Sequence, residues 1–150
     1  MQPVTLVYAI VVSILVVVLR PAYALAAYIG AVVWYPDYLR VSLGTIDISV
    51  SRIVITILLM RRMFDSRTAS KFSWCKLDTW VVASALIWTS VYCLASQDAA
   101  VAFENRGGFI IDTLFVYFAA RLTITDKQSI LSFSKAVALL IAPLAVLGIF

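Results

Sequence analysis

Six hydrophobic segments, separated by short polar stretches, constrain the fold of this chain more than any other feature. They lie at 4–19, 22–35, 48–64, 79–96, 108–123 and 131–150. A helix that crosses a bilayer needs about 20 predominantly apolar residues, and the fourth and sixth segments fit that length well. Because 63% of the chain is hydrophobic and only 13% is charged, there is too little polar surface to cover a soluble domain. The sequence therefore predicts an all-α, polytopic transmembrane protein with about five to six helices in one region, 1–150.

The first two segments are short, and Arg20-Pro21 stands between them. They are either two tilted helices or one long span kinked at Pro21, whose ring removes a helical hydrogen bond. Two helices are favoured, because Arg20 would be costly at the centre of a single span.

The distribution of charge predicts an orientation. Loop 65–78 and loop 121–130, with the helix ends beside them, carry most of the Arg and Lys residues. Basic loops stay on the cytoplasmic side of a membrane, so both are expected to be cytoplasmic. The loop between them and the loop before the third segment are then expected outside. The N-terminus is then outside if the first two segments are separate spans, and inside if they form one.

The end of the chain is apolar, with no charge from Ala136 to Phe150. A membrane helix normally closes with charged or aromatic residues at the interface. We therefore expect the chain to stop inside or just after its last span, as an N-terminal fragment of a longer protein.

Arg52 is the most informative single residue, because an arginine inside a membrane segment is costly and is a candidate for function. It can also reach toward the headgroups or pair with an acid. Asp112 lies one turn into the fifth segment, at the same face, so a structural Arg52–Asp112 ion pair is possible. Arg40 and Arg106 lie in loops at that face. Three guanidinium groups there would suit a lipid pyrophosphate, since arginine binds phosphate through a planar fork of donors.

Two acids and a pair of glycines are expected to mark helix boundaries. Asp47 and Asp78 precede the third and fourth segments and are expected to cap those helices. Gly107-Gly108 is expected to form a turn before the fifth segment.

Several kinds of site are not expected in this chain. It has no histidine, and its two cysteines, Cys75 and Cys93, are predicted near opposite membrane faces. A Ser-His-Asp or Cys-His pair is therefore excluded within the chain. Neither a metal site nor a cofactor is expected. The net charge of +4 is explained by the basic loops, so the predicted partners are membrane lipids and not nucleic acid.

Several short motifs follow one another along the chain. WYPDYLRV at 34–41 precedes ISVSRIV at 48–54, and GGFIID at 107–112 runs on to YFAAR at 117–121. A polar turn, TDKQ at 125–128, leads into a helix ending in LGIF. The order and spacing resemble the N-terminal part of the O-antigen ligase/polymerase-like family.

The resemblance implies part of a metal-independent glycosyltransferase of the bacterial inner membrane. Such proteins act on undecaprenyl-pyrophosphate-linked glycans outside the cytoplasmic membrane, with their catalytic residues in later helices and a large outer loop. The catalytic residues would then lie outside this chain, in missing C-terminal helices, and the fragment alone would be inactive. Arg40, Arg52 and Arg106 would be supporting contacts to the lipid pyrophosphate. The alternatives are a small integral membrane protein with a structural or partner-binding role and, third, a transporter fragment.

Overall fold

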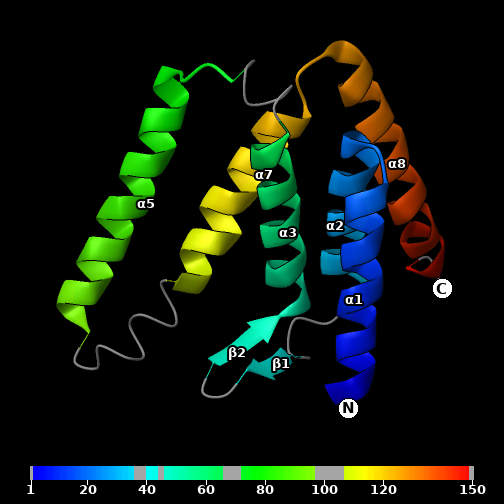
Figure 1. The fold of residues 1–150 in the computed structure, drawn as a ribbon, viewed down its shortest axis with the longest axis horizontal. Helices are drawn as coiled ribbons and strands as arrows, with labels where there is room; N and C mark the ends of the chain where they lie inside the picture. The colour runs from blue at the N-terminus through cyan, green and yellow to red at the C-terminus, as the bar shows by residue number, and fades with distance from the viewer. Residues whose placement is uncertain (1, 36–39, 44–45, 66–71, 97–106, 149–150) are drawn as a thin grey trace.

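A computed structural model describes residues 2–35, 40–43, 46–65, 72–96 and 107–148 of the chain. Its helical segments alternate in direction along the chain (Figure 1). The elements, in order, are α1 (Gln2–Val18), α2 (Pro21–Trp34), β1 (Arg40–Leu43), β2 (Ile46–Ser49), α3 (Val50–Phe64), α5 (Lys76–Ala95), the π-helix η1 (Ile111–Phe115), α7 (Val116–Thr123) and α8 (Lys127–Leu147). Residues 107–110 are helical and lead into η1.

The predicted all-α class is confirmed, with one small addition. Strands β1 and β2 pair antiparallel, with Arg40 opposite Ser49 and Leu43 opposite Ile46. The prediction missed this hairpin because it treated the segment between the second and third helices as a loop. Its Ile-Asp-Ile-Ser sequence alternates apolar and polar residues, which is the periodicity of a strand.

The first two hydrophobic segments form two antiparallel helices that pack against each other (Figure 1). The break falls at Leu19 and Arg20, and Pro21 occupies the first turn of α2. Proline is well tolerated there, because the first N–H groups of a helix have no partner within the helix.

The core lies where α3 packs against α1, α2 and α7. Val54, Ile55 and Leu58 of α3 are fully buried and meet Val16 of α1. Helix α2 contributes mainly small residues, which allow backbones to approach closely in helical membrane proteins. One of them, Gly30, has the side chain of Leu140 from α8 next to it.

Helix α5 stands apart from this core (Figure 1). Most of its large apolar side chains are exposed, and Asp78 and Ala85 are its buried residues. Within the described part of the chain, α5 is the one helix that is both long enough and apolar enough to cross a bilayer, judged by length and composition. Helices α1 and α2 are apolar but shorter. The polytopic arrangement therefore remains a prediction.

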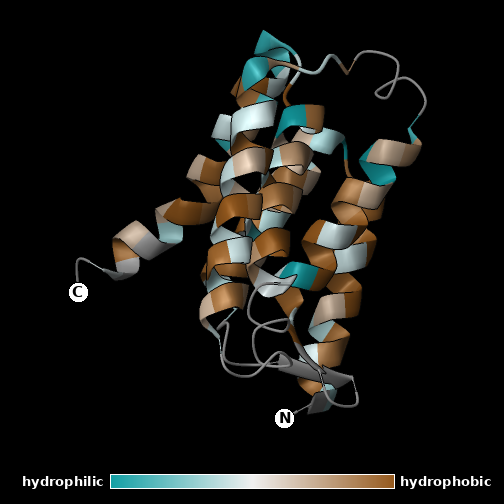
Figure 2. Cartoon of the chain, turned by 90° about the vertical axis from the view of Figure 1, so that its left-hand side faces the viewer, coloured by the Kyte–Doolittle hydropathy of each residue, from teal (hydrophilic) through white to brown (hydrophobic). Residues whose placement is uncertain are grey.

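Charged residues gather at one end of the helices, which Figure 2 shows as a hydrophilic cluster at the top of the molecule. We call it the basic end. The alternation of the helices brings together there Arg20, Arg61, Arg62, Lys76, Arg121 and Lys127, with Asp65, Asp78 and Asp126 among them. The opposite end, which we call the hairpin end, carries β1, β2 and the beginning of α3. The charge asymmetry read from the sequence is thus an asymmetry between two ends of the fold.

Candidate functional site

Arg52 and Asp112 form a two-pronged ion pair at the hairpin end. Arg52 Nη2 donates to Asp112 Oδ2 at 2.8 Å, and Nε lies 3.1 Å from Oδ1 and 3.2 Å from Oδ2. The two side chains are 23% and 48% exposed. This geometry orients the guanidinium plane and joins α3 to η1.

Gly108 makes room for the Arg52 guanidinium. A Cβ built on Gly108 would lie 2.6 Å from Cζ and Nη2 of Arg52, and 2.7 Å from Nη1. The expectation of a turn at Gly107-Gly108 is wrong, because both residues are helical. The absence of a Cβ at 108 is what allows the guanidinium to lie directly against the helix.

Asp112 lies in the π-helix η1, Ile111–Phe115. Such segments are rare and occur frequently at functional sites. Here the π-helix carries the carboxylate that pairs with Arg52, one turn after the glycine on which the guanidinium rests. The ion pair, the glycine and the π-helix together form the candidate site, which we call the Arg52 site.

The other two predicted phosphate contacts are placed less completely. The backbone of Arg40 pairs with that of Ser49, three residues before Arg52. Its side chain and the whole of Arg106 lie outside the described residues. The structure therefore brings Arg52 and Asp112 together, and the gathering of three guanidinium groups stays a prediction.

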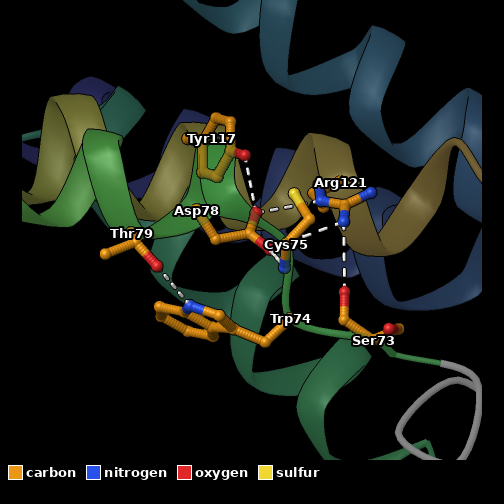
Figure 3. A network of polar contacts seen from close by, with 7 residues as sticks. All are labelled: Ser73, Trp74, Cys75, Asp78, Thr79, Tyr117 and Arg121. Atoms are coloured by element: carbon orange, nitrogen blue, oxygen red, sulfur yellow. Dashed lines mark hydrogen bonds and ion pairs between the residues drawn. The ribbon is translucent and has the colours of Figure 1, made fainter.

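A second polar cluster, around Asp78, lies at the basic end (Figure 3). The Asp78 carboxylate is 0% exposed. Its Oδ1 accepts from Tyr117 Oη at 2.6 Å and from Arg121 Nε at 2.9 Å, and its Oδ2 accepts from the Cys75 backbone N–H at 2.7 Å. Because buried carboxylates need such partners to stay ionised, the cluster holds the start of α5 against α7.

The sequence reasoning did not find this cluster. It placed Asp78 outside the fourth helix as a cap, whereas α5 begins at Lys76 with Cys75 as its N-cap and Asp78 two positions further in. Cys75 and Asp78 form a capping box, in which each side chain accepts from the other residue's backbone N–H. The spacing Cys-x-x-Asp, with Asp in place of the usual Glu or Gln, was the available signal. Nothing local predicts Arg121 as the partner.

Side chains around the cluster fix it further. Arg121 Nη2 also donates to the Ser73 carbonyl at 3.1 Å, and its guanidinium lies 5.9 Å from the centre of the Phe72 ring. Trp74 Nε1 donates to Thr79 Oγ1 at 2.8 Å. With its oxygens taken up by structural donors, Asp78 is a poor general base, so the cluster is a clamp between helices.

Two further arginines of the basic end cap the C-terminal ends of helices. Arg61 Nη1 donates to the carbonyls of Val16 and of Leu19, the latter at 2.7 Å. Arg62 Nη2 donates to the Leu122 carbonyl at 3.0 Å, and its Nη1 donates to Asp65 at 3.0 Å. The last carbonyls of a helix have no partner within the helix. Arg61 and Arg62 thus supply partners at the ends of α1 and α7.

Chemistry within the described ranges is limited. No cluster of carboxylate or thiol ligands that could hold a metal ion occurs there, and Cys75 and Cys93 are free thiols. The arrangement can bind and orient an anion at an arginine, and can join helices. No family model, curated protein or solved structure matches this chain.

Proposed function

We propose that the chain is the N-terminal membrane portion of a bacterial surface-polysaccharide polymerase or ligase that acts on undecaprenyl-pyrophosphate-linked glycans. The observation that carries this proposal is the position of Arg52. Its guanidinium lies at the end of the helices opposite the basic end, seated against Gly108 and oriented by Asp112. The Arg52 side chain is 23% exposed, so it is accessible in part to a ligand from outside the helices.

The sidedness supports a role outside the cytoplasm. Basic loops stay in the cytoplasm, so the basic end faces inward and the Arg52 site faces outward in a multi-pass protein of the inner membrane. That is the side on which lipid-linked glycans are joined. Helix α5 is long enough to span the bilayer between the two ends.

The part that Arg52 plays follows from the chemistry of the transfer. A hydroxyl of the acceptor sugar attacks the anomeric carbon, the bond to the pyrophosphate oxygen breaks, and the lipid pyrophosphate leaves with an added negative charge. A fixed guanidinium stabilises that charge. Asp112 keeps the guanidinium plane in place, and the groups that activate the hydroxyl belong to the helices and outer loop missing from this chain.

The proposal is tested by locating a bound lipid pyrophosphate. The chain is reconstituted in nanodiscs with a polyprenyl pyrophosphate that carries a photoreactive group beside the pyrophosphate, and labelled peptides are mapped by mass spectrometry. Labelling is expected near the start of α3 and in η1. Arg52→Gln should lower it about tenfold, the loss typical of one charge-assisted hydrogen-bonding pair.

Lys135→Gln is the matched control, because it removes the same charge from α8. It should leave the labelling near Arg52 unchanged. Equal labelling in wild type and Arg52→Gln, or labelling confined to the basic end, would contradict the proposal. Glycan transfer by the purified 150-residue chain would contradict the placement of the catalytic groups elsewhere.

A second candidate, an integral membrane protein with a partner-binding role, is favoured by the outer face of α5. Leu77, Trp80, Ile87, Val91 and Leu94 follow one another at helical spacing and are all more than half exposed. This face suits packing against a further transmembrane helix. Ile87→Trp should then abolish the association of the chain with that further helix in nanodiscs. Ile130→Trp, at another exposed apolar position, should preserve this association.

A further inference from the structure

A polar pocket opens at the basic end, and its lining shares no residue with the Arg52 site or the Asp78 cluster. It has a volume of about 420 Å³ and lies between the start of α2, the end of α7 and the start of α8. Charged and hydroxyl side chains line it, among them Arg20, Arg62, Thr123, Thr125, Ser129 and Ser132. Two other hollows of similar size are almost entirely apolar.

The N-termini of two helices converge on this pocket. Pro21, Ala22 and Tyr23, the first residues of α2, line it. The N-cap of α2 is Arg20, and no side chain there accepts a hydrogen bond from the first turn. The first N–H groups of a helix are unpaired within the helix, and together with the helix dipole they attract an anion.

Thr123 is an independent sign of a missing partner. The residue is 2% exposed, and its Oγ1 has no hydrogen-bond partner among the described residues. A hydroxyl buried without a partner is costly, and Thr123 is one of the residues that line the pocket. A bound oxyanion would accept its hydrogen.

Arginine supplies the charge. Arg20 is exposed, and no carboxylate of the described ranges forms an ion pair with it. Arg62 borders the same space while its guanidinium holds Asp65 and the Leu122 carbonyl. Asp126 is the one acid on the lining, and its Oδ1 accepts from the Ser129 backbone N–H at 2.6 Å. The acid thus caps α8, while α2 has no such cap.

We infer that this pocket binds a phosphate group, which caps α2, accepts from Thr123 and pairs with Arg20. Phosphate matches the set of donors, because it offers several oxygens to a guanidinium, a hydroxyl and backbone N–H groups at once. The space exceeds a single phosphate and also admits the atoms that carry one in an ester. The pocket lies at the ends of the helices, which in the predicted membrane arrangement is the depth of lipid headgroups. The phosphate therefore comes either from an anionic phospholipid or from solution.

The test measures binding to the purified chain and to three variants. Inorganic phosphate is titrated in a detergent without phosphate, with thermal unfolding as the readout, since a ligand of the folded state raises the midpoint with its concentration. In parallel, lipid retention is measured by native mass spectrometry after extraction from vesicles of phosphatidylglycerol and phosphatidylcholine.

Arg20→Gln should weaken binding about tenfold, and Thr123→Val, which changes no charge, about threefold to fivefold. Without phosphate, Thr123→Val should leave the fold unchanged or slightly more stable, because the valine has no hydroxyl to leave unpaired. Lys135→Gln makes the same charge change as Arg20→Gln, but on α8 and outside the pocket lining. It should bind phosphate as the wild type does.

Stabilisation by inorganic phosphate identifies free phosphate as a ligand, and selective retention of phosphatidylglycerol identifies the headgroup. Either result supports the site if Arg20→Gln and Thr123→Val reduce the stabilisation by phosphate or the retention of phosphatidylglycerol. The inference is overturned if neither probe binds, if binding is unchanged in Thr123→Val, or if Lys135→Gln reduces binding as much as Arg20→Gln.

Discussion

Arg121 Nε donates to the buried Asp78 carboxylate at 2.9 Å, although the two residues are 43 positions apart in the chain. This contact and the Tyr117 hydroxyl hold the beginning of a helix that otherwise buries little of its surface (Figure 3). The attachment of α5 therefore depends on a polar clamp at its first turn.

Asp78→Asn should loosen α5 from α7. The amide cannot satisfy Arg121, Tyr117 and the Cys75 N–H together, and its loss of charge leaves the guanidinium without a counter-ion. We expect the midpoint of thermal unfolding to fall by several degrees, with faster hydrogen exchange in the first turns of α5. Tyr117→Phe, which removes one hydrogen bond and keeps the ring, should have the smaller effect. Equal exchange in wild type and Asp78→Asn would show that the clamp does not hold the helix.

The two adjacent glycines before η1 should respond differently to alanine. At Gly107 a Cβ meets no atom within 4 Å, whereas at Gly108 it meets the Arg52 guanidinium. Gly107→Ala should be neutral or slightly stabilising, because alanine favours helix. Gly108→Ala should displace Arg52. Its free energy of unfolding should be about 1 kcal/mol lower than that of Gly107→Ala, which is the upper range for a partly exposed ion pair.

A double-mutant cycle tests whether Gly108→Ala is destabilising because it displaces the Arg52 guanidinium. In an Arg52→Gln background the shorter side chain can withdraw, so most of the difference between the two glycine substitutions should disappear. If Gly108→Ala remains equally harmful there, the glycine serves the backbone and not the guanidinium.

Arg61→Met should destabilise the end of α1. The substitution keeps an unbranched apolar stem but removes the donor to the carbonyls of Val16 and Leu19. Hydrogen bonds to charged groups contribute about 1.5–3 kcal/mol each, so we expect the loss of both to lower the free energy of unfolding by about 3 kcal/mol, the low end for two such bonds. Arg61→Lys should recover part of it, because the ammonium can still reach a carbonyl. Equal stability of all three proteins would rule out the capping role.

The two loops that flank α5 should lie on opposite sides of the membrane. In a background with Cys75→Ser and Cys93→Ala, single cysteines at Ser70 and Asn105 are labelled with a membrane-impermeant maleimide in intact cells. The serine keeps an oxygen at the N-cap of α5. The orientation predicted by charge requires labelling at 105 and protection at 70, reversed in inverted vesicles. Labelling of both from one side would reject it.

Local sequence was enough to find the helices. Long apolar segments have one stable arrangement in an apolar medium, because every backbone group then bonds within its own segment. The charge asymmetry between loops was equally readable, since it depends only on composition. The hairpin was missed because its strands are only four residues long each and the segment between the second and third helices was interpreted as a loop.

The pairing of charges depended on tertiary structure. Arg52 and Asp112 could be named as a possible pair, because each lies about one turn from the same end of its helix. Asp78 and Arg121 could not, since Asp78 was interpreted as a local cap and Arg121 as a loop charge. Sequence determined which segments are helical and which end is basic. Only the packing of α3, α5 and α7 decided which side chains meet, because the rotation of each helix about its axis depends on its neighbours as well as on its own residues.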